Sequence, residues 1–361
     1  MIISNNKNSR GERPGLKSLF YAFYIIFFAL VSVELFGQIQ YKIKYHEWLY
    51  KKDFGYQEKL FQPHPWLVGS PRPNTHVEYK GLRFSHNAQG YRGETFTTKK
   101  KLGIKRIVCY GGSTTYGAGV SDENTWPYYL GKNLGNRFEV INAGVPGYST
   151  VEAIIQTALQ QMDLSPDIAI YYLGWNDLRN MHIQELESDY SGYHGNNQRD
   201  NLGLNLLKIG NHSYVIWLLK KVLERTFSKR NEYELRGQMS SEVDLRALGI
   251  YEYNLQTIIA ISKSRNIKLF FIPQILNGGS LKADSSYGWA PFIKDKGMTK
   301  VMNVYNEQMI RICHVNNISC SRMLIENKWA DSDFLDQGHF SSKGNKKFAE
   351  LLASELAPLL N

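Results

Sequence analysis

The chain has 361 residues, of which 43% are hydrophobic and 21% are charged, a composition typical of a globular protein of one large domain or two. The net charge of +10 is spread over scattered Lys and Arg with only short clusters, and no nucleic-acid motif occurs, so we expect no nucleic-acid partner. Three cysteines exclude a disulfide framework, and neither CxxC nor HExxH occurs, so we expect no metal site and no cofactor.

The N-terminus predicts a membrane anchor. A basic leader over residues 1–17 precedes Ser18 to Val33, which carries no charge, and counted through Gln40 the segment exceeds the roughly 20 residues that span a bilayer. A cleaved signal peptide and a buried helix are the alternatives. A signal peptide has a shorter apolar core and an Ala-x-Ala type of site, which is missing here, so we favour a single transmembrane helix over 18–40. Four Lys or Arg precede the segment and four Lys follow it, so charge does not decide the orientation.

Residues 41–75 are rich in Tyr, Lys and Pro and predict an extended stalk. Polar turns between Val77 and Arg106 then indicate an edge hairpin, and we place one domain over residues 76–361. Beyond Arg106 apolar, β-prone runs alternate with helical patterns, which is typical of parallel strands joined by helices, a three-layer α/β/α domain. The predicted strands are Ile107–Tyr110, Phe138–Asn142, Ile168–Leu173, Ile267–Ile272 and Ile318–Met323, and the predicted helices are Val151–Met162, Tyr253–Ser264, Val301–His314 and Lys343–Leu356.

The stretch from Ile107 to Gly119 is the starting point for locating a functional site, because a short predicted strand leads directly into a turn that carries Ser113. Open α/β sheets place their chemistry at the carboxyl ends of strands, so Ser113 is a candidate nucleophile. Taken alone, this pattern more often marks a tight turn. Two other glycine-rich interpretations fail, because no Lys follows as in a phosphate-binding loop and the third glycine of a dinucleotide fingerprint is missing.

Candidate partners for Ser113 follow other strands. Glycines that leave backbone N–H groups open to a ligand lie after the second strand, an amide side chain lies after the third, and a carboxylate and an imidazole three residues apart precede the last helix. These blocks are Ala143–Gly147, Gly174–Asp177 and Asp336–His339.

Together with Gly112-Ser113-Thr114, these blocks resemble the SGNH hydrolases, the superfamily around the GDSL esterases and lipases. The resemblance implies a flavodoxin-like fold in which Ser113 is the nucleophile, His339 the base and Asp336 the residue that orients His339. It also implies an oxyanion hole formed by the backbone N–H groups of Ser113 and Gly147 and the side chain of Asn176. Gly147 matches the family's pattern better than Gly144 does.

Thr114 departs from the usual GDSL sequence motif. This puts assignment to the narrow lipase branch in doubt, but not assignment to the superfamily. The apolar N-terminal segment and the run Asn87 to Gly93 resemble bacterial membrane-anchored members associated with cell-surface polysaccharides. That resemblance implies an extracytoplasmic catalytic domain, periplasmic or extracellular, and an acylated carbohydrate or other ester as substrate.

The chemistry agrees with the resemblance. Serine is a poor nucleophile at neutral pH and needs a base, and an imidazole is suited to take its proton and return it to a leaving alcohol. Each block also has a structural interpretation, as a turn, a loop glycine or a helix cap. We expect a serine esterase that removes small acyl groups, most simply O-acetyl, while an O-acyltransferase and a non-catalytic glycan-binding protein remain alternatives.

An insertion over about residues 178–247 is predicted to border the site. Within it, Ser213 to Arg230 predicts a basic amphipathic helix, which either packs on its own domain, the alternative we favour, or lies on a membrane. Aromatic residues predicted in loops either stack on sugar rings or serve packing, and their positions do not decide between the two; they are Trp126, Tyr148, Trp175 and Trp289.

Overall fold

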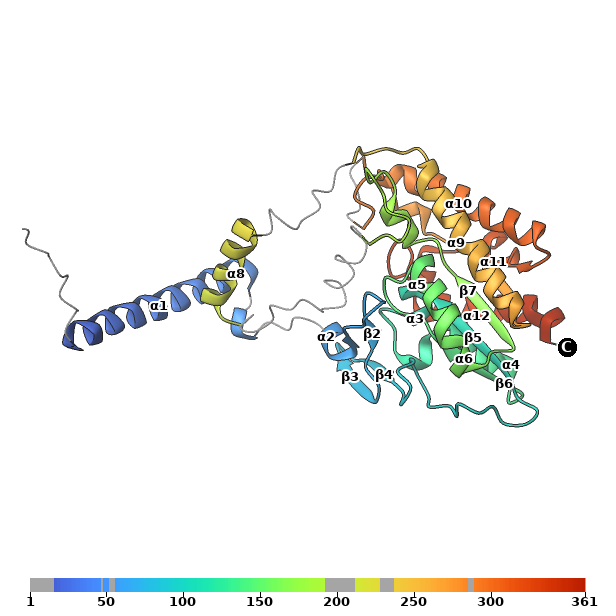
Figure 1. Ribbon diagram of the computed structural model, residues 1–361, viewed down its shortest axis with the longest axis horizontal. Helices are drawn as coiled ribbons and strands as arrows, with labels where there is room; N and C mark the ends of the chain where they lie inside the picture. The colour runs from blue at the N-terminus through green and yellow to red at the C-terminus, as the bar shows by residue number, and fades with distance from the viewer. Residues whose placement is uncertain are drawn as a thin grey trace, which may run out of the picture. The chain divides into compact units, whose positions relative to one another are not determined.

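The structure is a computed structural model that describes residues 16–46, 48–51, 56–191, 212–227, 237–284 and 289–360 (Figure 1). The chain divides into two compact units, which we describe separately. The first comprises Met1–Phe54 and Leu206–Glu232, and the second, the catalytic unit, comprises Gly55–Asn205 and Tyr233–Asn361. The polypeptide therefore passes between the units three times.

The catalytic unit is built on five parallel strands in the order β6-β5-β7-β8-β9, which confirms the predicted parallel sheet. The last strand has two residues instead of the predicted Ile318–Met323, because Met323 already begins a short helix, α11 (Met323–Glu326). The strand β5 has neighbours on both sides that follow it in sequence, so it lies where the chain connections diverge, the usual place for a ligand in such sheets. The strands are β5 (Lys105–Gly111), β6 (Phe138–Asn142), β7 (Ile168–Tyr172), β8 (Lys268–Ile272) and β9 (Ser319–Cys320).

Helices cover both faces of the sheet and give the expected three layers (Figure 1). Successive side chains of a strand point to opposite faces, so Val108 and Tyr110 of β5 join one hydrophobic cluster and Ile107 and Cys109 join the other. The first cluster lies under α5 (Thr150–Ile155), α9 (Leu245–Ser264) and α10 (Asp295–Val315). The second lies under α4 (Trp126–Leu134) and α12 (Ser342–Leu360).

All four predicted helices differ from the structure in their bounds, and the two predicted from Val301 and Lys343 are parts of the longer helices α10 and α12. The helix predicted over Val151–Met162 is α5, a π-helical turn at Gln156–Gln160 and α6 (Gln161–Leu164) in succession. The helix predicted from Tyr253 begins at Leu245, because the Asp244 side chain caps it by accepting hydrogen bonds from the backbone N–H groups of the first turn. The insertion, predicted to reach about residue 247, therefore ends at Asp244.

The predicted stalk is wrong over its second half. This part forms α2 (Gln57–Leu60), β1 (Phe61–Gln62) and β2 (Ser70–Pro71) and is followed by the expected hairpin, β3 (Thr75–Tyr79) with β4 (Leu82–His86). Leu60, Phe61 and Leu67 are buried in one cluster with Tyr116 and Tyr148. Apolar residues before and between the prolines therefore attach this stretch to the catalytic unit, instead of leaving it as an extended spacer.

The first unit contains α1 (Leu16–Tyr45), a 3₁₀ turn (Leu49–Lys51) and α8 (Tyr214–Phe227). Within the described residues, α1 is the one helix long and apolar enough to cross a membrane by length and composition, and it continues past Gln40, where the prediction ended. The helix α8 is the one predicted from Ser213, and residues 228–230 of that prediction lie outside the described residues. It contacts α1 in this unit.

Candidate active site

Ser113 stands at the first position of α3 (Ser113–Tyr116), a single turn that follows β5 through Gly112. The fold therefore places this serine at the carboxyl end of β5, as predicted. A residue at the start of a helix has a backbone N–H that the helix itself does not use, so both the hydroxyl and the N–H of Ser113 face the same edge of the sheet. Its side chain is half-buried, which leaves it open to a ligand.

The imidazole of His339 joins Ser113 to Asp336. His339 Nε2 lies 2.7 Å from Ser113 Oγ, and His339 Nδ1 lies 2.7 Å from Asp336 Oδ2. A carboxylate accepts hydrogen bonds only, so Nδ1 carries the proton in the neutral ring and Nε2 is left as the acceptor that faces the serine hydroxyl. This is the geometry in which a hydroxyl can pass its proton to a base.

The loop that carries Asp336 and His339 is closed on itself. Phe334 and Phe340 pair across it, and their rings stack with centroids 5.0 Å apart. The backbone N–H of Leu335 donates to the carbonyl of His339 at 2.7 Å. Paired apolar residues on both sides of the loop thus fix its ends to the core, and the two titratable groups are presented from a short, constrained turn.

Asp336 is held in its ionised form. Burial alone would raise the pKa of its carboxyl, but hydrogen bonds from the His339 side chain and from the backbone N–H groups of Gly338 and His339 outweigh burial and lower the pKa to about 2. The two backbone bonds go to Oδ1, at 2.9 and 2.8 Å, which leaves Oδ2 for the imidazole. A negative charge beside Nδ1 also favours the imidazolium that forms when His339 takes a proton.

Asn176 lies beside the serine turn. Its Nδ2 donates to the carbonyl of Tyr148 at 2.7 Å, and a Cβ added at Gly112 would overlap this nitrogen. Only glycine at 112 allows the amide to come so close to the backbone of the residue before Ser113. An amide nitrogen carries two hydrogens, and Tyr148 takes one of them, so the second is left for a ligand.

The loop after β6 contains both glycines that the sequence offered as oxyanion donors. The N–H of Gly144 donates to Asn142 Oδ1 at 3.0 Å and is therefore committed within the protein. Gly147 lies in a turn closed by a 3.1 Å hydrogen bond from Tyr148 N to the carbonyl of Val145. Since Asn176 binds Tyr148, the structure brings the Gly147 turn and the Asn176 amide to the same place.

Two braces of this site were not recognised from the sequence. The first is Asp177, a fully buried carboxylate that accepts hydrogen bonds from the hydroxyl and the N–H of Thr150 and from the Tyr190 hydroxyl. Thr150 follows the Gly147 turn and Asp177 follows Asn176, so this pair fixes the two loops to each other. In the sequence, Asp177 stands out only because it follows Asn176. Nothing in the sequence indicates that Thr150 and Tyr190 donate hydrogen bonds to it.

The second brace is Arg92, whose side chain is 1% exposed. Its guanidinium donates to the carbonyls of Tyr116, Gly117 and Val120 at 2.7 Å each and to Asp122 Oδ1 at 2.9 Å. These carbonyls end the one-turn helix α3 and the loop behind it, so Arg92 holds the turn that begins with Ser113. In the sequence, this arginine appears only within the run Asn87 to Gly93, which resembles membrane-anchored members of the family. That resemblance did not indicate a structural role for Arg92.

The four aromatic residues divide by burial. Trp126 and Tyr148 are 0% and 2% exposed, so both serve packing. Trp175 and Trp289 are half-buried, and the Arg179 guanidinium lies 4.2 Å above the ring of Trp289. Within the described residues, no three His, Cys, Asp or Glu side chains converge as metal ligands would.

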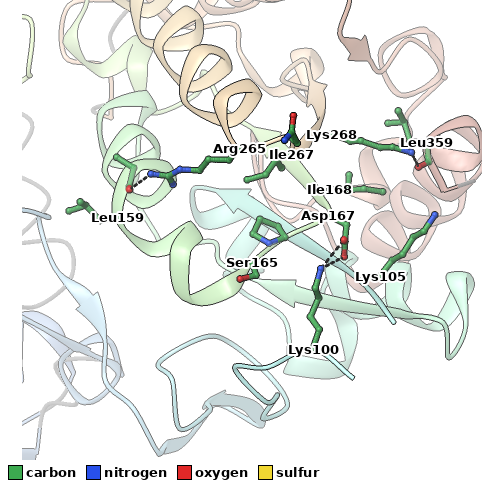
Figure 2. A pocket seen from close by; sticks show the side chains of 13 residues that line it. Lys100, Lys105, Leu159, Ser165, Asp167, Ile168, Arg265, Ile267, Lys268 and Leu359 are labelled. Atoms are coloured by element: carbon green, nitrogen blue, oxygen red, sulfur yellow. Dashed lines mark hydrogen bonds and ion pairs between the residues drawn. The ribbon is translucent and has the colours of Figure 1, made fainter. Parts of the chain in front are cut away.

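A hollow of about 800 Å³ lies at the other edge of the sheet, where Lys105 and Lys268 begin their strands (Figure 2). Its cations are engaged within the protein. Lys100 pairs with Asp167 at 2.7 Å, and Lys105 and Lys268 donate to the carbonyls of Leu360 and Leu359. The lining of the hollow does not bring a nucleophile together with a base, so we place the candidate chemistry at the Ser113 edge.

The chain is similar to several known proteins. A GDSL-like lipase from Bacteroides thetaiotaomicron VPI-5482 is similar in structure, with 14% identity, 71% of this chain and 89% of that chain covered, and a TM-score of 0.42. A catalytic mutant of an acetylxylan esterase from Geobacillus stearothermophilus has 12% identity, 71% and 96% coverage, and a TM-score of 0.38. No curated protein matches the sequence. The sequence profile of the GDSL-like Lipase/Acylhydrolase family matches residues 109–347, a range that holds Ser113, Asn176, Asp336 and His339, and the chain belongs to this family.

Proposed function

We propose that the protein is a membrane-anchored serine esterase that hydrolyses small acyl esters, most simply O-acetyl groups, on a carbohydrate. The observation that carries the proposal is the continuous series of short contacts from Ser113 Oγ through His339 to Asp336, both at 2.7 Å. Membership in an acylhydrolase family supports the reaction class. The carbohydrate rests on the sequence resemblance to members associated with cell-surface polysaccharides.

The reaction would proceed in two halves. His339 Nε2 takes the Ser113 proton as Oγ attacks the ester carbonyl carbon, and the same imidazole then gives the proton to the leaving alcohol. The acyl group remains on Ser113 until a water, deprotonated by His339, attacks its carbonyl carbon; the imidazole then returns that proton to Ser113 Oγ as the carboxylic acid leaves. Asp336 keeps the imidazole in the required tautomer throughout and is not itself protonated.

The carbonyl oxygen becomes negative in both halves. We assign its stabilisation to three donors, the N–H of Ser113, the N–H of Gly147 and the Asn176 amide, of which each single donor lowers the barrier by about 3 kcal/mol. Asp177 and Thr150 act behind them by fixing the two loops to each other. Fixed donors need no rearrangement when the charge forms, which is why the braces matter to the rate.

We further propose that α1 is the anchor and that the catalytic unit works outside the cytoplasm. The length and apolar composition of α1 support the first statement. The second rests on the resemblance to extracytoplasmic members, because the lysines that flank the segment do not set a direction.

The test is covalent labelling followed by product analysis. The full chain in detergent should react with a fluorophosphonate at Ser113, located by mass spectrometry, and Ser113→Ala should abolish the label. With acetylated xylan as a probe substrate, free acetate should appear in water. Labelling that persists in Ser113→Ala would contradict the assigned nucleophile. Acetyl groups that pass to an added glycan in preference to water would instead indicate the acyltransferase.

A further inference from the structure

The two helices of the first unit meet at Glu34, a carboxylate that follows the apolar run of α1. Its oxygens accept hydrogen bonds from Ser213 Oγ at 2.7 Å and from the backbone N–H groups of Tyr214 and Val215 at 2.9 Å each. The Gln38 side chain donates to it as well, at 2.7 Å. The N–H groups at the start of a helix lack partners within that helix and favour a negative charge. A side chain of α1 thus supplies the N-terminal cap of α8.

The same face of α1 is shaped to receive α8. Gly37 is buried, and a Cβ added there would overlap ring carbons of Tyr214, so only glycine admits this ring. The Gln38 side chain donates to the carbonyl of His212 at 2.8 Å and accepts from the N–H of Tyr50 at 3.1 Å. Docking therefore uses both a polar set of contacts and a steric fit.

Docking leaves one side of α8 uncovered and apolar. Leu218, Leu219 and Val222 are 40%, 54% and 53% exposed, and their spacing puts them on one side of the helix. Leu35 and Phe36 of α1, beside the docking residues, are 60% and 62% exposed. One small unit therefore presents lipid-compatible side chains from both of its helices.

The position of Glu34 along α1 indicates where α8 would lie. The uncharged residues from Ser18 to Val33 rise by about 24 Å as a helix, somewhat less than the roughly 30 Å of a bilayer's hydrocarbon core. Glu34 then falls near the boundary between hydrocarbon and headgroups, and so does the N-terminus of α8 that it caps. An amphipathic helix at this depth lies in the interface with its apolar side towards the acyl chains.

We propose that α8 is a second membrane contact, docked on α1 through Glu34 and Gly37, with Leu218, Leu219 and Val222 in the lipid interface. This proposal rests on the proposed role of α1 as the anchor. The partner is an anionic bilayer, because the sequence of α8 also carries Lys220, Lys221 and Arg225, which suit acidic headgroups. Since α8 lies within the insertion that interrupts the sequence of the catalytic unit, the chain would return to the membrane there in mid-sequence.

The experiment places a fluorophore on α8 in the full chain, reconstituted into vesicles of phosphatidylcholine and phosphatidylglycerol. Leu219→Cys carries an environment-sensitive dye in a background with Cys320→Ser, because Cys109 and Cys313 are buried. Tyr253→Cys, exposed on α9 of the catalytic unit, is the aqueous reference. We expect the dye at 219 to be shifted to the blue, quenched by nitroxide-labelled lipid and shielded from iodide, and the dye at 253 to show the reverse.

A matched pair of variants tests the docking. Gly37→Leu removes the space for the Tyr214 ring and should restore iodide quenching at 219, while Ala29→Leu adds bulk on an exposed side of α1 and should leave the shielding intact. A dye at 219 that is quenched by iodide as strongly as the dye at 253 overturns the proposal. Flotation of the unlabelled chain with the vesicles is measured first. A chain that fails to float refutes the anchor itself, whereas a chain that floats with a water-exposed 219 refutes only the contact through α8.

Discussion

Replacing Arg92 by Met tests whether the buried guanidinium holds the nucleophile turn. Met keeps an unbranched apolar stem but removes every hydrogen bond to the carbonyls of Tyr116, Gly117 and Val120 and the ion pair with Asp122. Removing one partner of a buried pair costs about 3 to 5 kcal/mol, because the groups left behind stay desolvated. The contacts share one side chain and are not additive, so the total loss is smaller than a sum over the single bonds.

The assay is thermal and urea unfolding of the full chain in detergent, followed by circular dichroism. With an unfolding entropy of about 2.1 cal/mol/K per residue, a loss of about 3 to 5 kcal/mol should lower the unfolding midpoint of a unit as large as the catalytic unit by roughly 5 to 9 °C. Arg92→Lys should recover only part of the loss, because one ammonium cannot reach all the acceptors that a planar guanidinium reaches. Arg83→Met, which removes a solvent-exposed pair with Glu123, is the matched control and should change little. An Arg92→Met protein as stable as this control would refute the reasoning.

Four further predictions concern the site and the helices. Gly112→Ala should displace the amide of Asn176 and lower kcat by about 10² to 10³ while the circular dichroism spectrum stays unchanged; normal turnover would exclude Asn176 as an oxyanion donor. Asp336→Asn should lower kcat by about 10⁴, because an amide no longer enforces the tautomer of His339, and near-normal turnover would exclude that role. The pKa of Asp336 is lowered from 3.8 to about 2, so its contribution to stability is complete above pH 3.8 and is lost as the pH falls towards 2. Urea midpoints at several acidic pH values should therefore fall more steeply for the wild type than for Asp336→Asn, and parallel curves would contradict the shift. Gly249→Ala, at an exposed position in α9 with nothing near the added Cβ, should raise the free energy of unfolding by about 0.5 to 1 kcal/mol in urea titrations, and a decrease would contradict the open space.

The sheet was predictable from the sequence because buried parallel strands read as continuous apolar runs. The run from Ile107 to Tyr110 and the run from Ile168 both became strands of the central sheet. The positions of Ser113, Asn176 and His339 followed from the rule that strand ends meet at one edge, together with the family resemblance. Their catalytic roles stay predictions until the labelling and turnover experiments are done.

The two braces, Asp177 and Arg92, and the docking of α8 on α1 were not predictable, because neither produces a periodic pattern in the sequence. Arg92 binds backbone carbonyls, and any sequence offers those, so no residue type marked its partners. Glu34 lies 179 positions from Ser213, which it binds. In the sequence, Glu34 only ends an apolar segment. The helix that begins at Ser213 was predicted to pack on its own domain. The structure instead pairs that helix with α1.

The second hydrophobic cluster has a consequence for how the protein is made. It joins β5 and α4 to α12, and the rings of Trp126 and Phe348 lie 5.1 Å apart within it. Lys105 and Leu360, which are hydrogen-bonded, are 255 positions apart. At a synthesis rate of about 5 to 20 residues per second, one face of β5 waits about 13 to 50 s for the helix that covers it. That face of the nascent sheet is therefore covered by α4 alone until α12 has left the ribosome. A chain that ends before Ser342 would leave the same face permanently open to aggregation.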